Sequence, residues 1–312
     1  MIVRLTTWTI IGALKLYKGE LLSQTAVSSV SHETQNPKAA SKRLDIQGLR
    51  AVCMVQVLLY HAWKIGSPIG VDSFIMISAY LLTSSFVRRS EAGKMPFFVE
   101  RWGHTFKRLL PPLAVTVTAI LGGVLVFFPP TRLPEMTTQA FASLTYWENW
   151  RLVDVAADYY AVDHTLQSPF QHLWSMSMQG QIFLLWPVLM TFCALGARGR
   201  KVSLRTVVAV AFGLLAGASL LWLLFFAPSD GSIYFDTRAR IWEFAFGSMI
   251  AALAPRLKVP PTVARVLAWV GLAVLVLFCL VSIGEYPRPM AFFPMAAVSL
   301  VLLYSGQCSC GG

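Results

Sequence analysis

Residues 203–227 read SLRTVVAVAFGLLAGASLLWLLFFA, with Arg205 as the one charged side chain. A helix of about 20 mostly apolar residues is long enough to cross the hydrocarbon core of a bilayer, so this stretch predicts a transmembrane helix. The rest of the chain has a similar character: 56% of its 312 residues are hydrophobic and 13% are charged, against about 25% charged residues in an average soluble domain. This composition excludes a disordered chain, a coiled coil and a collagen-like repeat, and it argues against an ordinary soluble enzyme.

The same criterion of length and apolar content predicts eight membrane spans along the chain. The predicted fold is an all-α polytopic membrane protein with about eight transmembrane helices, rising to nine or ten if residues 137–152 or the N-terminal segment also insert. The predicted spans are 46–64, 70–87, 109–129, 172–196, 203–227, 239–255, 262–283 and 288–305.

The charges between the spans alternate in sign, which tests this layout. Residues 88–108 hold six basic and two acidic side chains, whereas 130–171 hold two basic and five acidic ones. Because basic loops stay in the cytoplasm, both termini are predicted to be cytoplasmic. A crossing by 137–152 would invert the later pattern, so we interpret this segment as re-entrant or interfacial.

The formal net charge of +11 is therefore explained by loops at the cytoplasmic membrane face, and nucleic-acid binding is disfavoured. The lipid bilayer is the expected partner of so apolar a chain.

No internal repeat or linker divides the chain, so we expect one transmembrane domain over residues 43–305. Residues 1–42 are expected to be a partly disordered or interfacial leader, because the apolar run 5–17 is too short to span and no signal-peptide cleavage site follows it. Residues 306–312 are expected to be an irregular tail. The cysteines imply neither a disulfide framework nor a metal site.

Arg50 and His61 stand eleven residues apart in the first span. At 100° per residue both side chains project from the same face of the helix, with a rise of roughly 16 Å between them. Arginine holds phosphate in a bidentate manner, and imidazole accepts a proton near neutral pH. In the structural alternative, Arg50 reaches the interface and His61 caps the helix end.

Asp72 opens the second span, where it either orients His61 across the short 65–69 turn or caps the helix N-terminus. Ser78, further along the same span, is interpreted as a helix-packing group rather than a nucleophile.

Residues 172–181, HLWSMSMQGQ, begin the fourth span. So much hydrogen-bonding capacity is costly against lipid, which indicates a polar cavity. His172 is a second candidate base or a structural histidine at the interface. On the sixth span, Arg240 and Glu243 are three residues apart, which predicts an intrahelical ion pair and leaves contact with a ligand as the alternative.

Together, these blocks resemble the bacterial acyltransferase-3 family of integral-membrane O-acyltransferases. Arg50 with His61 matches the family's opening R-x10-H signature, and the similarity runs from about residue 43 to 305. The blocks that carry it are 43–51 with His61, 70–78, 107–111, 149–150, 168–175, 181–187 and 234–247.

The resemblance implies an enzyme that transfers an acyl group, most simply acetyl, from cytosolic acyl-coenzyme A to a hydroxyl of a cell-envelope glycan or glycolipid. It places the protein in the bacterial inner membrane, with acyl-coenzyme A as co-substrate and no permanently bound cofactor or metal. His61 would be the general base. The candidate residues are His61, Arg50 and Asp72 for catalysis; Arg101, Lys107 and Arg108, with Arg50, for the donor; and Asp45, Ser78, His172, Trp174, Ser175, Gln179, Gln181, Arg240 and Glu243 for the cavity and substrate.

The sequence departs from the family pattern at three points. Thr105 stands where the R-x-x-R motif has its first arginine, and Gln179 and Gly180 replace two glutamates. The chain also ends before the family's final spans, from which we expect a truncated homologue. The alternatives to an active transferase are a carrier of glycan or lipid, a non-catalytic membrane subunit and an inactive truncated homologue.

Overall fold

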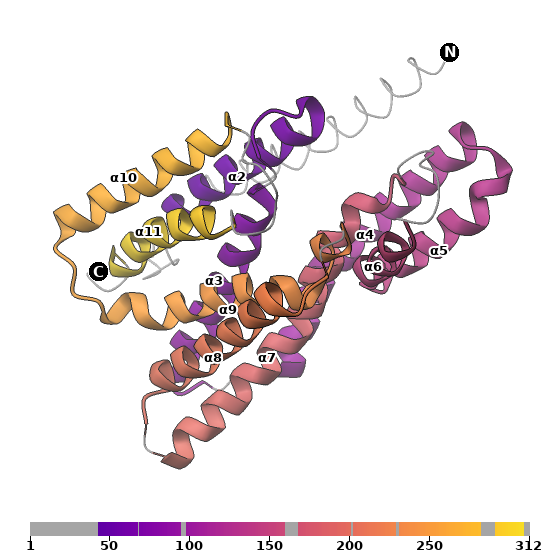
Figure 1. Ribbon diagram of the computed structural model, residues 1–312. Helices are drawn as coiled ribbons and strands as arrows, with labels where there is room; N and C mark the ends of the chain where they lie inside the picture. Colours follow the sequence, from indigo (N-terminus) through magenta and orange to yellow (C-terminus); the bar gives the residue numbers. More distant parts are fainter. Residues whose placement is uncertain are drawn as a thin grey trace, which may run out of the picture. The chain divides into compact units, whose positions relative to one another are not determined.

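The computed structural model describes residues 43–67, 69–94, 98–159, 168–200, 202–228, 231–281 and 291–308, and no strand occurs among them. The predicted leader, 1–42, and residues 309–312 lie outside the described residues. Figure 1 shows the order of the helices. They are α2 (Leu44–Trp63), α3 (Gly70–Glu91), α4 (Phe98–Phe127), η1 (Pro130–Arg132), α5 (Leu133–Leu144), α6 (Glu148–Tyr159), η2 (Gln171–Leu173), α7 (Trp174–Arg200), α8 (Leu204–Phe225), η3 (Gly231–Tyr234), α9 (Thr237–Leu253), η4 (Ala254–Arg256), α10 (Pro261–Phe278) and α11 (Phe292–Cys308).

Each predicted span coincides with one of these helices, which confirms the all-α membrane fold. Five of the helices in the described part of the chain are long and apolar enough to cross a bilayer: α3, α4, the segment Gln171–Gly199 that contains α7, α8 and α10. The total of eight spans stays a prediction, because α2, α9 and α11 do not meet this criterion.

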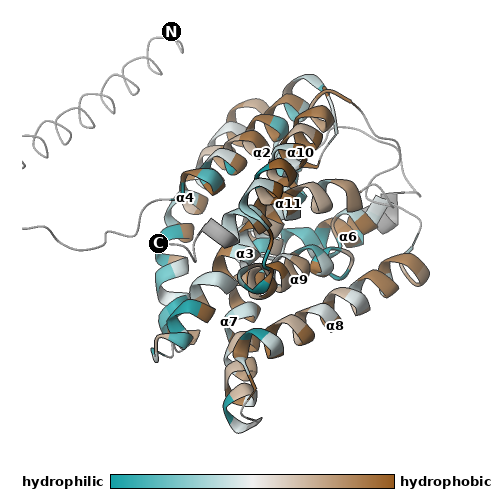
Figure 2. Cartoon of the chain, turned by 90° about the vertical axis from the view of Figure 1, so that its left-hand side faces the viewer, coloured by the Kyte–Doolittle hydropathy of each residue, from teal (hydrophilic) through white to brown (hydrophobic). Residues whose placement is uncertain are grey.

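Burial separates central from peripheral helices. In its most apolar window α3 is 61% buried, whereas α4 and α10 are each 17% buried. The outer helices α8 and α10 carry mostly hydrophobic residues (Figure 2), and Leu214 and Phe225 of α8 are more than two-thirds exposed. A soluble protein rarely exposes so much apolar surface, whereas lipid covers it without cost.

One end of the helix bundle is held by ionic contacts. Arg205, at the start of α8, pairs with Glu91, at the end of α3, through two N–O contacts of 2.7 Å. Arg256, directly after α9, donates to the first turn of α8, and Ser305 of α11 donates to Asp45 of α2. We call this the basic end.

The opposite end of the bundle contains the other termini of these helices. Ser67, between α2 and α3, bonds to the carbonyl groups of Phe278 and Val281 at 3.2 and 2.9 Å. The rings of His61 and His172 also meet here, with centroids 5.0 Å apart. We call this the histidine end. Since each of α2, α3, α7, α8, α9, α10 and α11 runs from one end to the other, the helices alternate in direction, in agreement with the alternating loop charges.

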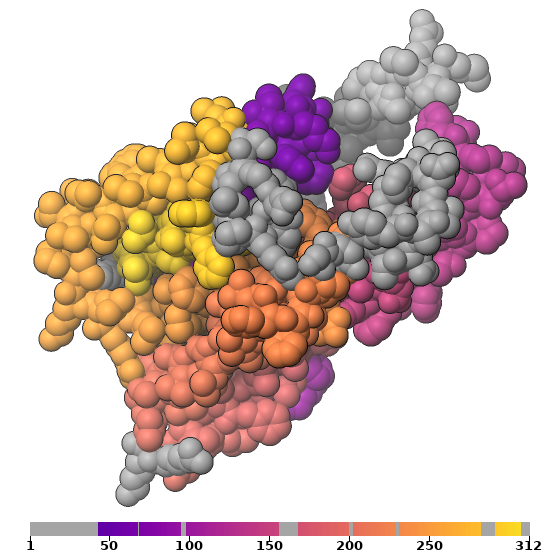
Figure 3. Space-filling view, in the orientation of Figure 1, coloured from indigo at the N-terminus to yellow at the C-terminus, as the bar shows by residue number. Residues whose placement is uncertain are grey.

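The C-terminal helices form one flank of the bundle. α10 packs along α11, and both contact α2; they appear as the orange and yellow surface in Figure 3. α11 continues to Cys308, so the prediction of an irregular tail is wrong for residues 306–308.

One further boundary differs from the sequence prediction. α4 begins at Phe98, eleven residues before the predicted span, so the basic residues 101–108 lie on a helix rather than in a loop.

Residues 137–152, predicted to be re-entrant or interfacial rather than to cross, are divided between α5 and α6, which have 12 residues each. A helix of that length rises only about 18 Å, too short to cross a core of roughly 30 Å.

The central contact between α3 and α9 depends on a glycine. A Cβ atom added at Gly247 would overlap the carbonyl oxygen of Met76. The next residue, Ser248, accepts hydrogen bonds from Thr83 Oγ1 at 2.9 Å and Trp186 Nε1 at 2.8 Å. Small residues and interhelical hydrogen bonds are the usual means by which membrane helices approach closely.

Gly247→Ala is expected to lower stability by about 1–3 kcal/mol, because the added methyl group forces α3 and α9 apart. Thermal unfolding in detergent, followed by circular dichroism, measures the effect. Gly217→Ala on α8 is the matched control, since an added Cβ there meets no atom within 4 Å. Equal melting temperatures for both variants would contradict this account of the α3–α9 contact.

Candidate active site

Two histidines from distant parts of the sequence meet at the histidine end. The edge of one ring faces the other, with centroids 5.0 Å apart and an interplanar angle of 81°. His61 lies in the last turn of α2 and His172 in η2, and both side chains are exposed. The structure therefore brings together the two candidate bases that the sequence singled out separately.

A backbone carbonyl orients His61. Its Nδ1 lies 2.8 Å from the oxygen of Val57. Because a carbonyl oxygen only accepts, Nδ1 carries the proton of the neutral ring and Nε2 keeps its lone pair. The exposed imidazole can thus take up a proton at Nε2.

Asp72 does not play either of its predicted roles. It neither orients His61 nor caps α3, whose N-cap is Ile69 and has no side-chain cap bond. The carboxylate is buried instead, with Oδ1 2.9 Å from Nη1 of Arg240. Both predicted roles were local, across the 65–69 turn or within α3 itself, whereas the partner of Asp72 lies on the distant helix α9.

Arg240, Asp72 and Glu243 form a cluster that we call the buried ion cluster. Nη1 of Arg240 lies 3.0 Å from Oε1 of Glu243, so the predicted intrahelical pair is confirmed. The three side chains are at most 1% exposed. The rings of Tyr234 and Trp174 lie against the guanidinium at 5.0 and 5.8 Å. The cluster thus joins α3 to α9 and brings the start of α7 against them.

Between the helices lies a cavity of about 680 Å³ lined by α2, α3, α4 and α7; we call it the arginine cavity. Its size falls within the range of small-molecule sites, about 300–1,000 Å³. Of the predicted donor residues, Arg50, Arg101 and Arg108 line the cavity, whereas Lys107 is not among the lining residues. The ionisable lining residues are Arg50, Arg89, Arg101, Arg108, His104 and Glu100.

Arg89 lines the cavity but is not among the predicted site residues. The excess of basic residues over 88–108, to which Arg89 belongs, is the sequence feature that indicates it. Thr105, which stands where the family pattern has an arginine, also lines the cavity. The arginines around it keep this part of the cavity wall positively charged.

The arginine cavity extends toward the histidine end. Ser78 and Gln179 line it, and Gln179 Nε2 donates to Ser78 Oγ at 2.9 Å. Gln179 follows His172 by seven residues, a helical rise of about 10 Å. The cavity therefore begins among arginines and ends within a few turns of the histidine pair.

The remaining predicted residues lie elsewhere. Gln181 is fully bonded: it donates to Tyr146 O and Asn149 Oδ1, both at 2.8 Å, and accepts from Trp150 and Thr237. It thereby fixes the start of α6 to α7 and α9.

Three other predicted residues do not line the arginine cavity. Asp45 is bound by Ser305 at the basic end, Trp174 packs in the core, and Ser175 is not among the lining residues.

The glycine in the Gln179–Gly180–Gln181 block has a structural reason. A Cβ at Gly180 would overlap the ring of Tyr146. Tyr146 lies in the turn between α5 and α6, with a backbone φ of +58°. The ring thus occupies the space that a glutamate at position 180 would need.

The comparisons with known proteins agree with this architecture. A family model described as an acyltransferase domain, acyltransferase-3, matches residues 43–310. The chain belongs to this family. No solved structure matches it significantly.

Among curated proteins the chain is similar to the O-acetyltransferase OatA of Staphylococcus aureus (strain NCTC 8325 / PS 47), with 29% identity over 67% of this chain and 34% of that protein. The peptidoglycan O-acetyltransferase OatA of Listeria monocytogenes is 30% identical over 70% of this chain and 35% of its own length. The putative membrane-bound transacylase BcsY of Komagataeibacter xylinus is 29% identical over 84% and 65%. The chain thus spans about a third of the OatA relatives.

Within the described part of the chain, no group of three or more His, Cys, Asp or Glu side chains is placed to hold a metal ion. The expectation that no metal takes part stays a prediction.

Arg240→Met is expected to cost about 3–5 kcal/mol, because it leaves two carboxylates buried without their cation. Adding Asp72→Asn and Glu243→Gln to this variant is expected to restore most of the loss. Chemical unfolding in detergent micelles measures both. Arg205→Met is the matched control, since its partner Glu91 is 42% exposed and stays in contact with solvent after the change, so the loss should be about 1 kcal/mol or less. No recovery in the triple variant would contradict the ionic account.

Glu148 predicts a pH effect outside the membrane spans. Its side chain is fully buried at the start of α6, and burial raises its pKa to about 8, opposed by Arg151 and assisted by Glu135. An unfolded glutamate titrates near pH 4.3, so the folded state binds an extra proton between these two values. The free energy of unfolding should therefore fall as pH rises from about 4.5 to 8.

Glu148→Gln removes this titration. The variant is expected to match the native protein near pH 4.5 and to exceed it in stability at pH 8, as measured by melting temperature against pH. Asp154→Asn, at an exposed site of the same helix, is the control. Parallel curves for the native protein and Glu148→Gln would refute the buried, protonated carboxyl.

Proposed function

We propose that this chain is a bacterial inner-membrane O-acyltransferase that moves an acetyl group from cytosolic acetyl-coenzyme A to a hydroxyl of a cell-envelope glycan or glycolipid. One observation carries the proposal. The single helix α2 presents Arg50 to the arginine cavity and His61 to His172, at levels about 16 Å apart along its axis.

The arginine cavity supports the donor assignment. Coenzyme A carries a diphosphate and a further phosphate on its ribose, and guanidinium groups bind phosphate in a bidentate manner while staying charged. Four arginines and one histidine against a single glutamate line the cavity. This charge favours a polyanion, and the basic end is the one that the positive-inside rule assigns to the cytoplasm together with both termini.

The histidine pair supports the chemical step. Nε2 of His61 takes the proton from the acceptor hydroxyl, and the oxygen attacks the thioester carbonyl carbon. The C–O bond forms, the C–S bond breaks, and coenzyme A leaves as a thiol after taking up a proton. General-base catalysis of this kind is worth about 10²–10⁴-fold in rate, and His172 lies where it can contact the imidazolium that forms.

The relatives support the acceptor class. The name of the Listeria relative states that it acetylates peptidoglycan, and an acceptor in the cell envelope is reached from the histidine end. We infer a glycan hydroxyl as the acceptor of this chain.

His61→Ala is expected to lower kcat for transfer of labelled acetyl from acetyl-coenzyme A to envelope glycan in membranes by about 10²–10⁴-fold. Because His61 is exposed, the melting temperature should stay the same. Mass spectrometry of the glycan identifies the acetylated product.

His104→Ala is the matched histidine control, since His104 lines the arginine cavity. It is expected to raise KM for acetyl-coenzyme A with little change in kcat. Full activity of His61→Ala would exclude the proposed mechanism. Movement of glycan across vesicles without any acyl donor would favour the carrier instead.

A further inference from the structure

A second pocket lies between α5 and α6. Its volume is about 450 Å³, and its lining residues all come from these two helices and the turn that joins them. Phe141 and Trp147 line it with side chains that are 70% and 57% exposed. We call it the hairpin pocket.

Both aromatic side chains line this pocket, where they offer ring faces to a ligand and are called the aromatic platform. An aromatic ring has a negative face, and the C–H groups on one face of a pyranose ring are weakly positive. A sugar therefore stacks on such a platform through attraction as well as apolar contact. Isolated exposed aromatics are ordinary at a membrane interface, so the platform alone does not identify the occupant.

The charged lining distinguishes a sugar from a lipid chain. Arg151 and Asp154 line the same pocket, one turn apart on α6. A guanidinium and a carboxylate side by side donate to and accept from sugar hydroxyls, whereas both would be costly against acyl chains. An aromatic surface beside a hydroxyl-binding pair fits a pyranose ring.

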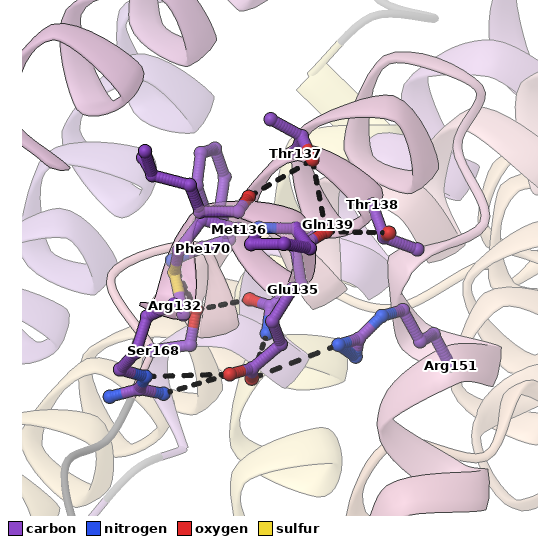
Figure 4. A network of polar contacts seen from close by, with 11 residues as sticks. Arg132, Glu135, Met136, Thr137, Thr138, Gln139, Arg151, Ser168 and Phe170 are labelled. Carbon is purple, nitrogen blue, oxygen red and sulfur yellow. Dashed lines mark hydrogen bonds and ion pairs between the residues drawn. The ribbon is translucent and has the colours of Figure 1, made fainter. Parts of the chain in front are cut away.

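Figure 4 shows a polar network that includes Arg151. Nη2 of Arg151 lies 3.9 Å from Glu135 Oε1, and the same carboxylate receives Arg132 Nη2 at 3.2 Å and Gln139 Nε2 at 2.9 Å. Within the described residues, the ion pair of Arg151 is long, so it orients the guanidinium and leaves the N–H donors available to a ligand.

The network also connects the hairpin pocket to the segment that bears His172. Gln139 bonds to Ser168, whose Oγ accepts from the backbone N–H of Phe170 at 3.2 Å. His172 follows two residues later, and α6 packs directly against η2. A ligand held by α5 and α6 therefore lies on elements joined to the proposed acceptor side of the reaction.

We propose that the hairpin pocket is a secondary subsite that binds a pyranose unit of the acceptor glycan outside the reacting position. The inference rests on the proposed function for its role in catalysis but not for binding itself. Phe141 and Trp147 supply the stacking surface, and Arg151 with Asp154 supplies the hydroxyl contacts.

The test measures binding of a β-1,4-linked N-acetylglucosamine tetrasaccharide to the detergent-solubilised full chain carrying His61→Ala, so that turnover plays no part. Adding Trp147→Ala is expected to raise Kd about tenfold, the effect of losing one aromatic contact. Trp269→Ala on α10, which is 67% exposed and distant in the fold, is the matched control and should leave Kd unchanged.

Arg151→Gln keeps the aromatic platform and is expected to weaken binding independently. In the active background, Trp147→Ala should raise KM for the tetrasaccharide without changing kcat or KM for acetyl-coenzyme A. Binding that depends on Trp147 in a chain without transferase activity would support the subsite and reject the proposed function.

Two outcomes would overturn the subsite. The first is the same Kd for Trp147→Ala and Trp269→Ala. The second is quenching by brominated phospholipid of the fluorescence difference between the chains with and without Trp147→Ala, unrelieved by the tetrasaccharide, which would show that lipid covers the pocket.

Discussion

The guanidinium of Arg240 lies between two buried carboxylates, and the arrangement of the central helices depends on this contact. Asp72 comes from α3 and Glu243 from α9, so the cluster fixes these helices against each other where Gly247 lets their backbones approach. Burying one cation and two anions is costly unless they are paired. Trp174 packs over the guanidinium, which places the start of α7, and hence His172, beside the end of α2.

This arrangement of helices places the two chemical regions of the protein at different ends of α2. The arginine cavity opens among α2, α3, α4 and α7, whereas the histidine pair lies at the opposite end of α2. A donor bound by its phosphates would extend its thioester along α2, past Ser78 and Gln179, toward His61. The helix that bears the family's R-x10-H signature thereby connects the two regions.

Hydropathy and charge predicted the helices because both are local properties of the sequence. The resemblance to the family implied that Arg50 acts with Arg101, Lys107 and Arg108, and the excess of basic residues agreed with it; the arginine cavity contains the three arginines but not Lys107. The contact between His61 and His172, and the pairing of Asp72 with Arg240, depend on how distant helices pack. Periodicity contains no information on such contacts. The sequence therefore predicts local roles for Asp72 and a cavity position for Gln181, whereas both side chains bond to distant segments.

The central claim is that the acetyl group passes from a donor at the basic end to an acceptor at the histidine end. Sealed vesicles of known orientation test it directly, with labelled acetyl-coenzyme A supplied only at the face of the basic end and the tetrasaccharide only at the opposite face. The account predicts labelled tetrasaccharide on the histidine side, and none when the two substrates are exchanged between faces. Label that appears only when both substrates share one face would contradict it.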